Sequence, residues 1–345
     1  MFRKNIRIKY FTCLVILLVG FAAYKFYNDV FTANVNSTDG KPVYVFIRTG
    51  KSFDFLLNDL DKNKLIFNVD GFRRLAKLMK LDLNLKPGKY KLDAGMNNQQ
   101  IIRKLKSGTQ ETINLVFNHA ERKSELPSIF SKHLELDTNY FSILLNDTAI
   151  FNEYGFDSSN IISLFLPNTY NMYWNTSSSQ LFHRMKKEYD KFWNKERLTK
   201  AYLIHLSPQQ VSTLASIVEK ETNKLSEMPL IARVYLNRID RNMPLQADPT
   251  LIFALNDKSI HRVLLAHTEI LSPYNTYLNL GLPPGPICSA SIQAIDAVLN
   301  ATKHNYIYFC AKEDFSGYHV FAETLKLHNQ NAKRYQKELN NRQIY

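Results

Sequence analysis

SPQQVSTLASIVEKETN, from Ser207 to Asn223, carries the clearest helix signal in the chain. Ser207 can accept a hydrogen bond as the N-cap residue, Pro208 suits the first helical position, and Gln210 completes the spacing of a capping box. The pattern predicts one buried face, because side chains that can pack in a core recur at intervals of three and four residues. They are Val211, Leu214, Ala215, Val218 and Thr222.

Two glutamates lie at the edges of this predicted helix. At about 100° per residue, Glu219 falls at one edge of the buried face and Glu221 at the opposite edge, so their side chains point apart. A carboxyl group at the margin of an apolar surface is partly removed from water, which raises its pKa towards the range of a general acid. The helix therefore offers one candidate acid to a cleft, and the spacing permits either glutamate. Ordinary solvated edge charges are the alternative.

Residues 243–250 read MPLQADPT and predict a turn that leads into a short helix at 250–255. Asp248 precedes Pro249, so it can act as the N-cap residue of that helix. The functional alternative has Asp248 and Gln246 lining a cleft opposite Glu219, where they would hold a sugar or a developing positive charge.

Residues 272–287 read SPYNTYLNLGLPPGPI and predict a loop stiffened by prolines. Rigid polar loops on a packed scaffold commonly carry binding groups. Tyr274, Asn275 and Tyr277 are therefore candidates for saccharide contacts.

LASIVEKETN, RVYLNR at 233–238, MPLQADPT and the proline-rich loop occur in one order along the chain. Together they resemble the MltG (YceG-like) family of membrane-anchored endolytic murein transglycosylases, with weaker similarity from about Val43 to about Leu339. The resemblance implies that Glu219, the first acid of EKET, is the catalytic residue and that Glu221 is the alternative. It also implies that residues 43–109 form a LysM-like module, a type that recognises glycans containing N-acetylglucosamine.

The activity implied by the resemblance is cleavage of the bond between N-acetylmuramic acid and N-acetylglucosamine, with 1,6-anhydromuramyl ends and limited strand length. In that scheme Glu219 transfers the protons, Asp248 supports the oxocarbenium-like state, and Gln246 and Asn275 position the sugar. A muramidase that uses water as the nucleophile is one alternative, and a non-enzymatic wall-binding or scaffold protein is another. Peptidoglycan strands are the expected partner, and peptidoglycan synthases are candidate partners.

The 345 residues contain 44 Lys and Arg against 31 Asp and Glu, a formal net charge of +13. Such a charge favours an anionic environment. The cations are scattered and no nucleic-acid motif accompanies them, so a membrane surface or wall polymer is favoured over nucleic acid. No zinc-type Cys/His spacing occurs, and we expect neither metal nor cofactor. Cys288 and Cys310 can be free thiols or a disulfide pair.

The N-terminus combines basic residues with an apolar run, which predicts a retained membrane anchor. A cleaved signal peptide is the alternative, although no small-residue cleavage site follows. The positive-inside rule then leaves the N-terminus cytoplasmic and the catalytic part outside the bacterial inner membrane, in the periplasm or extracellular space.

We expect an α+β fold, with a small α/β module followed by a mostly helical domain that contains a β-hairpin. Within the module we expect a strand at 43–47, two helices of which Ser52 caps the first, a strand at 89–92 and a helix capped by Asn97. The expected divisions are a cytoplasmic tail at 1–9, a transmembrane anchor at 10–27, a tether at 28–42, the LysM-like module at 43–109 and the catalytic domain at 110–345.

Overall fold

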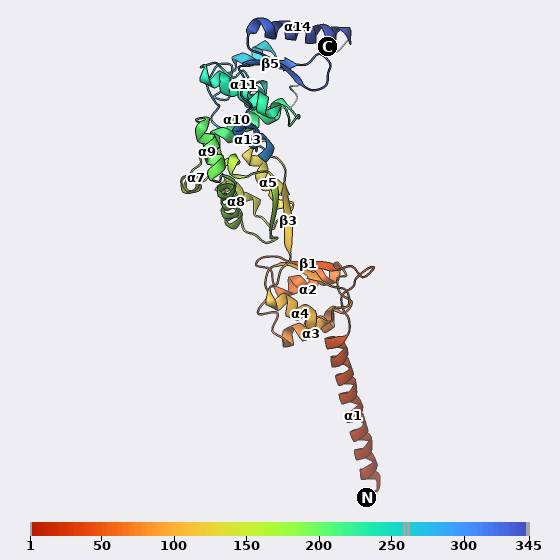
Figure 1. The fold of residues 1–345 in the computed structure, drawn as a ribbon. Helices are drawn as coiled ribbons and strands as arrows, with labels where there is room; N and C mark the ends of the chain where they lie inside the picture. The colour runs from red at the N-terminus through yellow and green to blue at the C-terminus, as the bar shows by residue number, and fades with distance from the viewer. Residues whose placement is uncertain (1, 258–259, 261–262, 343–345) are drawn as a thin grey trace. The chain divides into compact units, whose positions relative to one another are not determined.

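A computed structural model describes residues 2–257, 260 and 263–342, which fall into two compact units (Figure 1). The first unit contains the chain up to Asn114 together with His133–Glu135 and Asn171–Thr176. The second contains Leu115–Lys132, Leu136–Tyr170 and the chain from Ser177 onwards. Helices and small two-stranded sheets make up the described chain, which confirms the α+β class.

The first unit surrounds an antiparallel pair of strands with three helices. Its elements follow the predicted order: β1 Val43–Ile47, α2 Phe53–Lys62, α3 Val69–Leu78, β2 Gly88–Leu92 and α4 Asn98–Ser107. Ser52 and Asn97 cap α2 and α4 as expected, since their side chains accept hydrogen bonds from the backbone N–H groups of Phe55 and Gln100. Apolar side chains from all five elements form one core.

The apolar N-terminal run is part of α1, Phe2–Phe31, whose segment Ile8–Phe31 is long and apolar enough to cross a membrane. The last turn of α1 belongs to the first unit rather than to a tether. Asp29 is buried and receives two hydrogen bonds from the Arg74 guanidinium group, of 2.8 and 2.9 Å. Ala33 then forms a β-bridge with Asn97. The tether predicted at 28–42 therefore differs from the structure, because residues 29–36 pack into the module.

The second unit is mostly helical, and the boundary between the units falls within β3 and β4. The strands outside the first unit's sheet are β3 Thr112–Phe117, β4 Asn168–Tyr173, β5 Tyr308–Ala311 and β6 His319–Ala322, paired as β3–β4 and β5–β6. The helices up to the central one are η1 Lys123–Glu125, α5 Leu126–Ser131, α6 Thr138–Leu144, α7 Thr148–Tyr154, η2 Ile161–Leu164, α8 Ser178–Phe192, α9 Lys195–Leu203 and α10 Pro208–Glu221. The remaining helices are α11 Met228–Asp240, α12 Asp248–Leu255, η3 Leu265–Glu269, α13 Ile292–Leu299 and α14 Leu325–Asn341.

α10 is the central helix of the second unit and packs against α9, α11, α12 and α13 (Figure 1). Its capping box is formed as predicted: the Ser207 hydroxyl oxygen accepts from Gln210 N, and the Gln210 side chain accepts from Ser207 N. The expectation of a single buried face is too narrow, because every residue from 211 to 218 is buried. The buried hydroxyl groups are accommodated because they donate to carbonyl oxygens of their own helix: Ser212, Thr213 and Ser216.

Candidate active site

The last residue of α10 opens into a pocket of the second unit. Glu221 is half-buried, and its Oε1 accepts a hydrogen bond of 2.6 Å from the hydroxyl group of Tyr235 on α11. Among the residues that the structure describes, the other carboxyl oxygen, Oε2, has no hydrogen-bond partner. We call the space in front of it, of about 380 Å³, the glutamate pocket. It is lined by Glu221, Tyr235, Arg238, Leu245, Gln246, Asp248, Tyr277, Tyr308, Phe309, Leu325, His328 and Asn329.

The Glu221 carboxyl group is strongly perturbed by its position in this pocket. Burial raises its pKa to about 7, against the hydrogen bond from Tyr235 and the charge of Arg238, which lower it. The carboxylate of Asp248 adds to the rise, since two negative charges in one pocket repel each other. At neutral pH the group is therefore divided between its acid and base forms, which is the condition for transferring a proton in both directions.

Asp248 lies in the same pocket, at the start of α12. The helix begins at Asp248 rather than at Thr250, and its N-cap residue is Ala247, so the predicted capping role of Asp248 is wrong. The side chain instead accepts a hydrogen bond of 2.5 Å from the hydroxyl group of Tyr277, a residue of the proline-rich loop. Asp248 therefore lines the glutamate pocket together with Glu221, whereas the functional alternative placed it opposite Glu219.

Gln246 is held in the pocket by a buried arginine. Arg238 donates hydrogen bonds to the carbonyl oxygens of Ile307, Pro244 and Leu245 and to Oε1 of Gln246, the last at 3.2 Å. Gln246 has a φ of +51°, a left-handed backbone conformation that residues other than glycine rarely adopt. A strained residue at a pocket is a common feature of functional sites, because the surrounding structure must hold it in place.

Tyr235 and Arg238 were not predicted as site residues. Their sequence signal was only their place in the helical register of RVYLNR, which is also the signal of core residues. The pairing of Tyr235 with Glu221 depends on the packing of α10 against α11 and cannot be read from either segment alone.

Glu219 occupies a different environment on the opposite side of α10. Its Oε2 accepts a hydrogen bond of 2.7 Å from the backbone N–H of Ser291, the N-cap residue of α13. A carboxylate at this place accepts a hydrogen bond from an N–H group that has no partner within the helix. Its negative charge is also stabilised by the positive end of the helix dipole. Glu219 is not among the residues that line the glutamate pocket. The structure brings Glu221, not Glu219, together with Asp248 and Gln246.

The proline-rich loop contributes one of its three candidates to the glutamate pocket. Tyr277 lines it, whereas Tyr274 packs on Phe253 with ring centroids 4.8 Å apart and lines another pocket. Asn275 is fully buried; its amide nitrogen donates to the carbonyl oxygens of Thr268 and Ile270, and its oxygen accepts from Tyr277 N. Asn275 therefore shapes the loop from inside and has no free group for a sugar.

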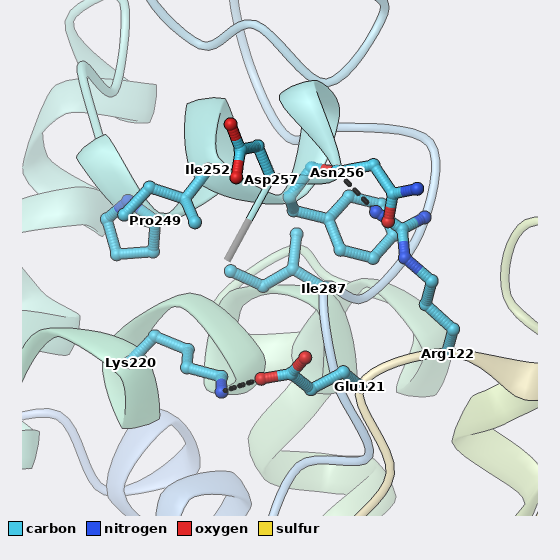
Figure 2. A pocket seen from close by; sticks show the side chains of 9 residues that line it. Glu121, Arg122, Lys220, Pro249, Ile252, Asn256, Asp257 and Ile287 are labelled. Carbon is cyan, nitrogen blue, oxygen red and sulfur yellow. Dashed lines mark hydrogen bonds and ion pairs between the residues drawn. The ribbon is translucent and has the colours of Figure 1, made fainter. Parts of the chain in front are cut away.

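The Lys220 side chain lines a neighbouring pocket of about 320 Å³, where it forms an ion pair (Figure 2). Lys220 and Glu121 lie on one wall and form an ion pair of 3.2 Å, while α12 residues including Pro249 and Ile252 lie across the space. The charge of Lys220 is thus already paired. Cys288 and Cys310 are free thiols, and within the described ranges no cluster of His, Cys, Asp and Glu side chains could hold a metal ion.

The chain is similar to several known proteins. The endolytic murein transglycosylase of Bacillus subtilis is 29% identical over 314 residues, covering 85% of this chain and 84% of that protein. The Streptococcus pneumoniae protein of the same name is 28% identical over 80% of this chain, which spans only 55% of the streptococcal length. A crystal structure of a YceG-like protein from Listeria monocytogenes aligns with a TM-score of 0.53 and 27% identity, covering 85% of this chain and 99% of that one.

The profile of the YceG-like family matches residues 45–334, which is most of the chain. The chain therefore belongs to the YceG-like family.

Proposed function

We propose that this protein is an endolytic peptidoglycan lytic transglycosylase and that Glu221 is its catalytic acid and base. The observation that carries the proposal is the carboxyl group of Glu221, with a pKa raised to about 7, in a pocket that also contains Asp248, Tyr277 and Gln246. The relatives in Bacillus subtilis and Streptococcus pneumoniae carry the name endolytic murein transglycosylase, which supports the same substrate class.

The proposed reaction needs one carboxyl group, because the substrate supplies the nucleophile. Protonated Glu221 donates its proton to the oxygen between N-acetylmuramic acid and N-acetylglucosamine, and the bond from that oxygen to muramyl C1 breaks. The C6 hydroxyl of the same muramyl residue then attacks C1 and gives its proton to the Glu221 carboxylate. The products are an N-acetylglucosamine hydroxyl end and a 1,6-anhydromuramyl end, and Glu221 is again protonated. An intramolecular hydroxyl has a high effective concentration for such a step.

The neighbours of Glu221 have supporting roles in this scheme. The Asp248 carboxylate, oriented by the Tyr277 hydroxyl, would stabilise the positive charge that develops at C1. Gln246 would bind the sugar next to it, since Arg238 holds its side chain in the pocket. Neither the acid nor the nucleophile in this mechanism is supplied by a metal ion or cofactor.

A muramidase is the second candidate, because Asp248 gives the pocket a second carboxylate. Hydrolytic glycosidases commonly use two carboxyl groups, one of which activates water. Mass spectrometry of glycan strands digested by the purified full chain distinguishes the reactions. Anhydro ends identify the transglycosylase and reducing ends the muramidase, whereas strands of unchanged length would leave only a wall-binding or scaffold role.

The choice between the two glutamates has a direct test. Glu221→Gln should lower the rate of strand cleavage by about 10²–10⁴-fold, because the amide cannot transfer the proton. Glu219→Gln is the matched control and should keep most of the activity, since an amide oxygen can still accept from Ser291 N. If Glu219→Gln is inactive and Glu221→Gln is active, the proposed assignment is wrong and the first acid of EKET is catalytic.

We further propose that α1 anchors the protein in the bacterial cytoplasmic membrane, with its N-terminus in the cytoplasm and the chain after α1 outside. The apolar segment Ile8–Phe31 supports this, and basic residues precede it. The first unit has the strand–helix–helix–strand order expected of a LysM-like module, and we propose that it binds glycan. Attachment to the membrane would keep the site near nascent strands and their synthases.

A further inference from the structure

A second pocket adjoins the glutamate pocket at Glu221. We call it the lysine pocket; it has a volume of about 520 Å³, and Glu221 lines both pockets. Its walls come from the end of α10 and the loop after it, from the β5–β6 hairpin and from α14. Glu221 therefore belongs to the walls of both pockets, so that a polymer occupying both would contact it.

Three lysines line this second pocket, but two of them already have carboxylate partners. Lys220 pairs with Glu121 at 3.2 Å, and Lys312 pairs with Asp314 at 2.8 Å. Lys224 is the remaining cation, and within the part of the chain that the structure describes it has no ion-pair partner. Its ammonium group lies 4.9 Å from the centroid of the Tyr318 ring. An ammonium group held against an aromatic face keeps its charge available to an anion on its open side.

The position of Lys224 is fixed by its surroundings. Glu227 is buried; its carboxylate accepts from the Thr222 hydroxyl at 3.3 Å and from the backbone N–H of His319 at 2.7 Å. These bonds join the loop that carries Lys224 to strand β6. At the hairpin turn, Gly317 has a φ of +76°, and a Cβ atom there would lie 3.3 Å from Cε of Lys224. The turn thus packs closely on the lysine stem.

We propose that Lys224 forms a subsite for a carboxylate carried by the muramyl residue next to the cleaved bond. This inference rests on the proposed function and names the part of the substrate that the lysine pocket recognises. In murein such a carboxylate has two sources: the peptide stem, or the lactyl group when the stem has been removed. The Tyr318 and Phe315 rings line the same pocket and add apolar surface beside the lysine.

The experiment compares three strand preparations as substrates for the full chain: strands with intact stems, strands whose stem carboxyl groups have been converted to amides, and strands from which an amidase has removed the stems. Lys224→Ala should cut the carboxylate-bearing strands about tenfold more slowly than the wild type and leave the amidated strands unchanged, as expected for losing one charge-assisted hydrogen bond. Lys224→Arg should restore the rate. Lys187→Ala, which removes an exposed charge on α8, is the matched control and should have no effect.

The outcomes separate the possibilities. A loss on both intact and denuded strands, with none on amidated strands, shows that Lys224 binds either carboxylate. A loss confined to intact strands assigns the stem carboxylate, and a loss confined to denuded strands assigns the lactyl carboxylate. An equal loss on all three preparations, or no loss on any, overturns the carboxylate subsite. If the wild type cuts none of the three preparations, the proposed function fails, which is a different result from failure of the subsite.

Discussion

The hydroxyl group of Tyr235 limits how far burial raises the pKa of Glu221. Its hydrogen bond stabilises the ionised carboxylate and lowers the pKa, while burial acts more strongly in the opposite direction. Tyr235 is itself buried, and its own pKa is raised because burial disfavours the phenolate. The phenol therefore remains a donor throughout the working range. Tyr235 is therefore a positioning residue, and Glu221 is the group that transfers the proton in the proposed reaction.

Cleavage should decline as the pH rises through about 7, because Glu221 must enter the reaction as the acid. Tyr235→Phe removes a bond to the ionised form, so the pKa of Glu221 rises and the alkaline limb moves to higher pH by up to about one unit. The pH dependence of the single-turnover rate measures this shift. Tyr202→Phe, at an exposed tyrosine on α9, is the control. A limb that stays in place, or moves to lower pH, would contradict this role.

Arg238 shows how a buried cation can be retained when no carboxylate of the described chain forms an ion pair with it. Its guanidinium group donates to the carbonyl oxygens of Pro244, Leu245 and Ile307, which belong to two separate segments. These bonds replace the water lost on burial, so that the charge is compensated by peptide dipoles. One consequence is that the turn carrying Gln246 is held beside the β5–β6 hairpin.

The junction of α10 and α13 links the candidate site to the core. Glu219 and Glu221 are separated by one residue, yet one binds the start of α13 and the other faces the glutamate pocket. The prediction that their side chains point apart is confirmed by these different contacts. Helical geometry accounts for it, since residues two apart are rotated by about 200°.

Glu219→Ala should lower the free energy of unfolding by about 1–2 kcal/mol, because the Ser291 N–H at the start of α13 loses its acceptor in a partly buried position. Thermal or denaturant unfolding of the purified protein measures the change. Glu153→Ala removes an exposed carboxylate on α7 and should alter stability by much less. Equal stability of the two variants would argue against a structural role for Glu219.

Local patterns predicted the elements well where their signals lie within one or two turns. The capping box of α10 and the Asn97 cap of α4 are formed as expected, and β1 has its predicted bounds. The same patterns underestimated how deeply α10 is buried, since serine and threonine count as polar in a periodicity argument. In the folded chain Ser212 and Ser216 donate to their own helix and pack inside. Burial of this kind depends on neighbouring helices, which no short window contains.

The first unit and the end of the apolar helix α1 form one structure. Val30 and Val35 are part of the core of that unit, and Asn34 donates to the Asn98 side chain and to the carbonyl oxygen of Asn68. Because these residues precede β1, the folded module begins at the last turn of α1. The described chain thus passes from the candidate membrane span into the module without the expected tether.

A soluble fragment that begins at residue 28 should therefore fold, whereas one that begins at Val43 should be less stable. The shorter fragment loses the buried side chains of Val30 and Val35 and leaves Asn98 without Asn34, a cost of about 3–5 kcal/mol. Thermal unfolding of the two fragments tests this, with the full chain in detergent as the reference. If both fragments unfold at the same temperature, residues 28–42 act as the tether that the sequence suggested.

Short-range chemistry accounts for what could be read from the chain alone: the caps of α4 and α10, the strand and helix order of the first unit, the apolar span and the family motifs. These features depend on residues a few positions apart, whose hydrogen bonds and spacing are set by the local backbone. The choice of Glu221 as the pocket acid, the burial of Asn275 and the incorporation of residues 29–36 into the module came only from the folded structure. Each depends on segments far apart in the chain, because solvent exclusion and pKa are properties of what packs around a group.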